Sequence, residues 1–253
     1  MFSSILINKS QPLEQFAIQI ILNCYGFFIN NLVIYFNLIV ILIIFYFIYP
    51  LFNYKKIPNN LQLFSQDIYK FLITLFYQQT NNFTSLQYFP LISSIFLIIL
   101  ISNLLGLTPF GFTITSHLYI TAFISVSIFF GITLLGFINN KFNFFKYFVP
   151  SGVSNKTLLY FLIGIEIISY IIRPLSLAIR LFANMLAGHT LLFILSGFAI
   201  QISKKKVLYL VFIPISIILL VFFLELAIAF IQAYVFTILL IIYINEIYNV
   251  NSH

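Results

Sequence analysis

A mostly apolar stretch over residues 165–190 carries several side chains that could hold or transfer charge. Its composition predicts a helix inside a membrane, where one ionisable side chain costs at least about 2.5–3.5 kcal/mol on insertion scales. At about 100° per residue, one face of this helix is polar or small throughout. That face comprises Glu166, Ser169, Arg173, Ser176, Arg180, Asn184 and Ala187. Such a face on an apolar helix requires a partner other than lipid.

The residue types in this stretch and the next one suit proton transfer. The next apolar stretch, residues 207–248, adds Glu225, Gln232 and Glu246. A guanidinium such as that of Arg180 stays charged and favours the ionised form of a carboxylate that meets it. His189 titrates near neutral pH, and with a carboxylate such as Glu225 it could form a proton relay. The amides of Asn184 and Gln232 could position water or Arg180.

Composition places these residues in a polytopic membrane protein. Of 253 residues, 62% are hydrophobic and only 7% are charged, and the polar stretches between apolar runs are too short for a soluble domain. The net charge of +7 comes mainly from lysines that flank apolar runs, which disfavours a nucleic-acid partner. The lone Cys24 excludes an internal disulfide. We find no metal-ligand cluster and no Gly-rich nucleotide loop, and expect no cofactor.

The apolar runs predict the elements that must position these residues. Residues 61–77 alternate apolar and polar positions at helical spacing, which predicts an amphipathic helix on the membrane surface. The two last runs are each about twice as long as a hydrocarbon core is thick, so hydropathy alone would cut each into two spans. The predicted divisions of this single membrane domain, 1–253, are an N-terminal segment 1–31, a first span 32–49, the amphipathic helix 61–77, a two-span hairpin 88–138 and a long block 157–248 with a hinge at 203–206.

The motif around Arg180 is similar to the signature of subunit a of F-type ATP synthases. The run Arg180-Leu-Phe-Ala-Asn-Met and the following Ala-Gly-His189 carry this resemblance, and Glu166 lies fourteen residues before Arg180, where the family places an acid. Mitochondrial members have His at the place of His189 and Glu at the place of Glu225, whereas bacterial members usually have the acid and the His exchanged. This exchange indicates that the two residues work as a pair. Weaker similarity covers residues 11–16 and 86–116.

The resemblance implies an all-α membrane protein with about five membrane helices and one amphipathic surface helix. It also implies that the last two helices are long, strongly tilted and paired as a hairpin. In the family, this subunit provides two aqueous half-channels, and the residue matching Arg180 faces the c-ring. Carried over, His189 and Glu225 would take up the proton, and Glu166 and Glu246 would line its release. Asn184 and Gln232 would complete the pathway.

The resemblance further implies partners and location. It predicts a non-nucleotide-binding subunit, without enzymatic activity of its own, in the mitochondrial inner membrane. The partners would be a c-ring with its proton-carrying carboxylate, peripheral-stalk and other membrane-sector subunits, lipid including cardiolipin, and a second ATP synthase in a dimer. The N-terminus has neither a transit-peptide nor a secretory pattern, which favours synthesis inside the organelle. The lysine-rich side would face the matrix: Lys55, Lys56, Lys70, Lys141, Lys146 and Lys156.

Other interpretations stay open from the sequence. Arg173 could be an interfacial anchor or a helix-packing charge, Glu246 a solvated end, and His117 a solvated histidine in a turn. The whole chain could also be a proton-relay subunit of another transporter or respiratory complex. A purely structural membrane subunit is a further alternative, but it leaves the polar face unexplained.

Overall fold

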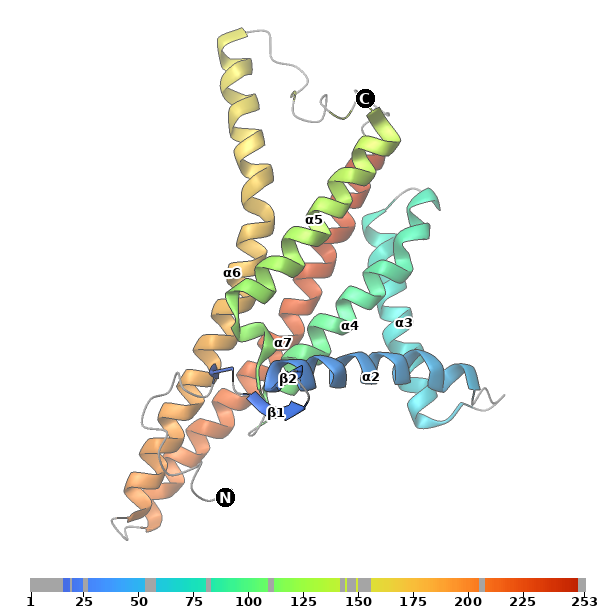
Figure 1. The fold of residues 1–253 in the computed structure, drawn as a ribbon. Helices are drawn as coiled ribbons and strands as arrows, with labels where there is room; N and C mark the ends of the chain where they lie inside the picture. The colour runs from blue at the N-terminus through green and yellow to red at the C-terminus, as the bar shows by residue number, and fades with distance from the viewer. Residues whose placement is uncertain are drawn as a thin grey trace. The chain divides into compact units, whose positions relative to one another are not determined.

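The computed structural model describes residues 16–18, 20–24, 27–52, 58–80, 83–108, 112–141, 144, 149, 156–204 and 208–249. Figure 1 shows two short strands followed by helices. Their bounds are β1 (Ile20–Cys24), β2 (Phe27–Asn30), α2 (Asn31–Phe52), α3 (Asn60–Gln79), the 3-10 turn η2 (Phe83–Tyr88), α4 (Phe89–Gly106), the 3-10 turn η3 (Ile114–Ser116), α5 (Leu118–Asn140), α6 (Lys156–Lys204) and α7 (Leu208–Asn249).

Five of these helices are long and apolar enough to cross a membrane: α2, α4, α5, α6 and α7. Helix α3 covers the segment predicted to be amphipathic, and its buried residues include Leu72, Leu75 and Phe76. The predicted fold class is therefore confirmed. The antiparallel pair of β1 and β2 is an addition that the sequence did not indicate, because a strand of four or five residues is too short to show a clear period.

The two last helices are continuous over 49 and 42 residues. Each contains a proline, Pro174 in α6 and Pro214 in α7, which removes one backbone donor without ending the helix. Helix α2 likewise passes through Pro50 and extends to Phe52, beyond the predicted end of the first span at residue 49. A proline in the last turn removes only one hydrogen bond of the helix, so the helix continues three residues past the predicted end. The predicted hinge at 203–206 lies partly outside the described residues.

The chain divides into two compact units, which we describe separately. Unit 1 comprises Met1–Ile44, Ile98–Leu118 and Leu181–Ala233. In it, the C-terminal part of α6 and the N-terminal part of α7 lie side by side (Figure 1). Ala229 and Ala233 are fully buried, since small side chains let membrane helices approach closely.

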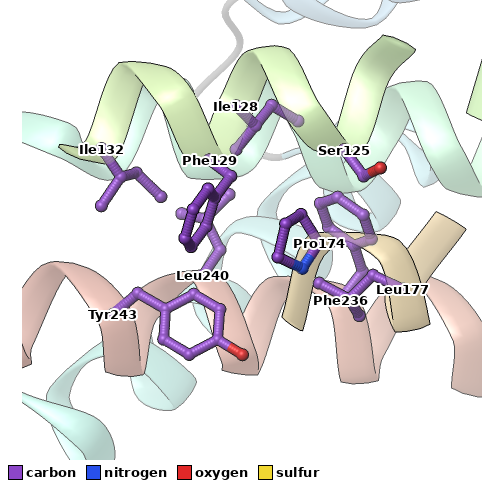
Figure 2. A pocket seen from close by; sticks show the side chains of 9 residues that line it. All are labelled: Ser125, Ile128, Phe129, Ile132, Pro174, Leu177, Phe236, Leu240 and Tyr243. Carbon is purple, nitrogen blue, oxygen red and sulfur yellow. The ribbon is translucent and has the colours of Figure 1, made fainter. Parts of the chain in front are cut away.

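Unit 2 comprises Phe45–Leu97, Tyr119–Arg180 and Tyr234–His253. Its helices α5, α6 and α7 pack around Pro174 and enclose a small apolar pocket of about 10 Å³ (Figure 2). The lining residues come from all three helices: Ser125, Ile128, Phe129, Ile132, Pro174, Leu177, Phe236, Leu240 and Tyr243. This packing fixes the part of α6 that carries Arg173.

Candidate functional site

The seven predicted site residues fall into two groups, one in each unit. Asn184, His189, Glu225 and Gln232 belong to unit 1, and with Asn103 we call them the buried polar cluster. Glu166, Arg180 and Glu246 belong to unit 2, and with Arg173 and Tyr243 we call them the arginine cluster. Helix α6 contributes to both groups, as does α7.

Glu225 is the one acid of the buried polar cluster. Its side chain is only 3% exposed, and neither carboxylate oxygen has a hydrogen-bond partner among the described residues. The carboxylate lies directly against the backbone of Gly188, where any Cβ atom would collide with it. Burying a polar group without a hydrogen-bond partner costs free energy. Within a membrane-spanning segment, the hydrocarbon of the lipid cannot supply such a partner. Glu225 is therefore a buried carboxyl group whose hydrogen bonds the described residues do not supply.

Three amide side chains belong to the same unit as this acid. Asn184 on α6 donates a hydrogen bond of 3.3 Å from Nδ2 to Gln232 Oε1 on α7. Asn103, fully buried on α4, donates from Nδ2 to the backbone carbonyl of Ala229 at 3.4 Å. The remaining polar atoms, Asn103 Oδ1 and Gln232 Nε2, are buried and have no partner in the described part of the chain. These amides can each bind water as well as one another.

His189 lies in the same unit but is not hydrogen-bonded to Glu225. Both Glu225 oxygens lack a partner among the described residues, as does His189 Nε2. The backbone of Gly106 lies near the imidazole, and the ring of Phe16 meets it edge-on with centroids 6.1 Å apart. The predicted pair is thus brought into one unit, with Glu225 against the residue that precedes His189. Any proton exchange between the two side chains would pass through water.

Arg173 is the centre of the arginine cluster in unit 2. Its Nη2 lies 3.3 Å from Glu166 Oε1, and its Nη1 lies 3.3 Å from Glu246 Oε2. The guanidinium also lies 5.2 Å from the ring centroid of Tyr243 and 5.9 Å from that of Tyr170. Glu246 is therefore ion-paired as well as partly exposed, and Arg173 joins α6 to α7 within unit 2.

A groove of about 500 Å³ opens beside Arg173. Arg180 lines it, together with Ser169, Ser176 and Tyr243. Arg180 itself is exposed, and Ser176 one turn earlier is exposed and small. In unit 1, Ala183 and Ala187 of the same helix are also exposed. An arginine on an exposed face of small residues within a membrane helix needs a partner that carries negative charge.

Three residues that contact the predicted site residues or their helices were not predicted from the sequence: Asn103, Gly188 and Tyr243. Asn103 is not among the predicted site residues, and its contact with Ala229 on α7 first links it to the polar cluster. Gly188 was part of the family motif without a physical role, and Tyr243 carried no signal at all. His117 is half-buried, and its ring contacts that of Phe112 with centroids 5.2 Å apart. Burial lowers the pKa of His117, so it is held neutral more strongly than a solvated histidine.

Within the described ranges, no three His, Cys, Asp or Glu side chains lie together as a metal site. The chain instead combines spanning helices, buried carboxyl, imidazole and amide groups, and an exposed arginine. This combination defines a polytopic membrane protein of the kind that moves ions.

Comparison with known proteins gives the family. The model of the ATP synthase A chain family matches residues 33–245. ATP synthase subunit a of Acanthamoeba castellanii is 50% identical over 250 residues, which cover 96% of this chain and 98% of that protein. The subunits a of Marchantia polymorpha and Chondrus crispus are 42% and 40% identical, with 95% and 94% of this chain covered, and 98% and 96% of the relatives. The chain belongs to the ATP synthase subunit a family, the proton-translocating subunits of the membrane sector, and its partners are other ATP synthase subunits.

Proposed function

We propose that this chain is the proton-channel stator subunit of a mitochondrial F-type ATP synthase and couples proton flow to rotation of a c-ring. The observation that carries the proposal is the buried polar cluster. Glu225, His189 and Gln232 each hold buried polar atoms without partners in the described part of the chain, within segments that span a membrane. Such atoms are tolerated at that depth when water reaches them, which is what an aqueous half-channel requires.

Proton uptake would use this cluster. A proton from the intermembrane side would reach Glu225 and His189 through water and pass from there to a carboxylate of the c-ring. Both groups can change protonation state, and the amides of Asn184 and Gln232 can orient the water between them. Neutralised, the ring carboxylate can face lipid at much lower cost than an ion.

Arg180 would separate uptake from release. Its charge is permanent, and it lies exposed on α6 beside small residues, so a ring helix can approach it. A ring carboxylate that meets this guanidinium is favoured in its ionised form. A fixed positive charge also obstructs a proton that would leak directly from one half-channel to the other.

Release to the matrix would use the arginine cluster. The groove beside Arg180 is lined by Ser169, Ser176 and Tyr243, and Glu166 and Glu246 lie against Arg173, which also lines it. Each charge that crosses the membrane gains about 2.3 kcal/mol per 100 mV of potential. ATP chemistry would reside on other subunits, so this chain would bind no nucleotide and have no enzymatic activity of its own.

The proposal extends to location and assembly. We place the chain in the mitochondrial inner membrane, encoded in the organelle, with its lysine-rich connections in the matrix. Peripheral-stalk and other membrane-sector subunits, cardiolipin and a second ATP synthase in a dimer are its proposed neighbours. The relatives' names support assembly into ATP synthase, and the finer partners follow from the motif around Arg180.

The decisive experiment replaces Arg180 by Ala in the reconstituted complex. ATP-driven proton pumping and passive proton leak are recorded in the same vesicles, with assembly checked on a native gel. We expect assembled complex without pumping. Lys156→Ala removes an exposed charge near the start of the same helix and should pump normally. Undiminished pumping by Arg180→Ala would show that Arg180 is structural and would overturn the proposed mechanism.

A further inference from the structure

We propose that Arg173 is a positioning residue for proton release: it lines the groove, holds the carboxylates of Glu166 and Glu246 together and balances one of their two charges. This inference rests on the proposed function, because it assigns a role within the release half-channel. It goes beyond it in naming Arg173, which neither the motif nor the polar face distinguishes from an ordinary anchor.

The geometry gives each acid its own nitrogen. Arg173 Nη2 contacts Glu166 Oε1 from the same helix, seven residues earlier, and Nη1 contacts Glu246 Oε2 from α7, both at 3.3 Å. A planar guanidinium can present two donors in fixed directions, whereas an ammonium is a point charge. The two acids are thus held at a set separation by one rigid group. That separation is the quantity that Arg173 controls.

The surroundings lock the guanidinium in place. Tyr243 and Tyr170 lie near its carbon, with ring centroids 5.2 Å and 5.9 Å away. The next residue, Pro174, packs among α5, α6 and α7 in the small apolar pocket of Figure 2. The Arg173 side chain is 22% exposed, less than Glu166 at 38% and Glu246 at 35%. Arg173 is therefore the least exposed member of the trio, and both acids keep an exposed edge.

The charge count gives the functional consequence. One guanidinium and two carboxylates carry a net charge of −1, and removal of the guanidinium would leave −2 at the same place. Two carboxylates without a cation repel each other, so one of them would retain a proton. Among the described residues, the other charged or titratable groups that face this site are Arg180 on α6, which lines the groove, and the phenols of Tyr170 and Tyr243. Loss of Arg173 should make proton release harder.

A purely structural role predicts something different. If Arg173 only staples α6 to α7, its loss lowers assembly or stability, but the assembled complex keeps its pH profile. The readout that separates the two roles is therefore the dependence of ATP synthesis on the pH of the matrix side. It is measured in the full reconstituted complex at constant driving force.

Four variants make the test sharp. For Arg173→Gln, we expect the rate of ATP synthesis to fall about tenfold, because the two carboxylates are no longer held in position. We also expect the pH of half-maximal synthesis on the release side to rise by about one unit, because the carboxylates lose a neighbouring positive charge. Arg173→Lys keeps the charge and should keep the pH profile. Adding Glu246→Gln to Arg173→Gln restores the net charge of −1 and should return the midpoint toward wild type. Lys156→Gln, an equal charge loss elsewhere on α6, should change neither quantity.

The outcomes also separate this inference from the proposed function. An unchanged midpoint in assembled Arg173→Gln would overturn the positioning role, whatever the rate. A midpoint that the second substitution fails to move back would overturn the charge-balance argument. If Arg180→Ala still pumps in the same vesicles, the proposed function itself fails. If Arg180→Ala abolishes pumping but Arg173→Gln leaves the pH dependence of ATP synthesis unchanged, the proposed function stands and only the positioning role of Arg173 fails.

Discussion

The backbone of Gly188 on α6 lies directly against the carboxylate of Glu225 on α7. A Cβ atom added at Gly188 would lie 2.6 Å from the Glu225 carboxyl carbon and 3.0 Å from its Cγ, well inside normal contact distance. The absence of a side chain on one helix is therefore what makes room for the acid on the other. With a larger residue at position 188, the Glu225 carboxylate would have to shift from its present place.

We predict that Gly188→Ala displaces the Glu225 carboxylate and sharply slows proton transfer. The methyl group forces the carboxylate or the two helices apart, and overpacking of this kind costs about 1–3 kcal/mol. Proton-driven ATP synthesis in reconstituted vesicles measures the effect. Gly197→Ala is the matched control, because a Cβ at Gly197 on the same helix meets nothing within 4 Å. Equal rates for the two variants would contradict the packing argument.

We predict that Glu225→Gln abolishes most proton transfer without impairing assembly. The amide has the shape of the carboxyl group but cannot release a proton, and a proton-transferring side chain contributes about 10²–10⁴-fold. Both oxygens of Glu225 lack hydrogen-bond partners among the described residues, so the substitution removes no hydrogen bond to those residues. Coupled synthesis and a native gel measure the two properties. Glu225→Asp keeps a carboxyl group and should retain more activity. Normal coupled rates for Glu225→Gln would exclude the relay role.

We predict that Asn184 and Gln232 are energetically coupled through their hydrogen bond of 3.3 Å. In a double-mutant cycle of Asn184→Ala and Gln232→Ala, the effects on proton-pumping rate should be less than additive. Residues in contact typically show coupling energies of about 0.5–3 kcal/mol. As a control, Asn184→Ala combined with Thr74→Ala, whose hydroxyl donates a hydrogen bond to the Phe71 carbonyl within α3, should be additive. Additivity in the first pair would show that the amides act separately.

We predict that Asn245→Ala loosens the attachment of α3 to α7. Asn245 Nδ2 donates a 2.8 Å hydrogen bond to the backbone carbonyl of Gln79, the last residue of α3. Loss of such a bond typically costs about 0.5–1.5 kcal/mol and leaves a carbonyl less well satisfied. Limited proteolysis or amide hydrogen exchange of α3 in the purified complex measures the loosening. Protection that equals wild type would mean that apolar contacts of α3 suffice to hold it.

We predict that His117 makes stability depend on pH in the mildly acidic range. Burial lowers its pKa below the ordinary 6.5, so the folded protein binds this proton less readily than the unfolded chain does. The contribution is present above pH 6.5 and is lost as the pH falls through the lower folded-state value. Thermal unfolding of the complex between pH 8 and pH 5 should show a smaller decline for His117→Gln than for wild type. Parallel declines would assign the acid sensitivity to other groups.

The helices of this protein and its family can be predicted from the order of its residues. Apolar runs without helix stops give spanning helices, because a backbone in lipid must satisfy its own hydrogen bonds. The period of apolar positions separates amphipathic α3 from its spanning neighbours. The seven-residue spacing of Glu225 and Gln232 places both on one face of α7. Arg180 and its motif were sufficient for the resemblance, which the full-length relatives confirm.

The partners of these residues could not be obtained in this way. Arg173 lies on the predicted polar face, but its contact with Glu246 joins positions 73 residues apart in the chain. Three other contacts also join residues that are far apart in the chain: Asn184 with Gln232, Gly188 with Glu225, and Asn103 with Ala229. Helical periodicity fixes which residues share a face, but not how far one helix slides or turns against the next. That register depends on close packing of many side chains, so only the tertiary structure decided which charges meet and which stay unpaired.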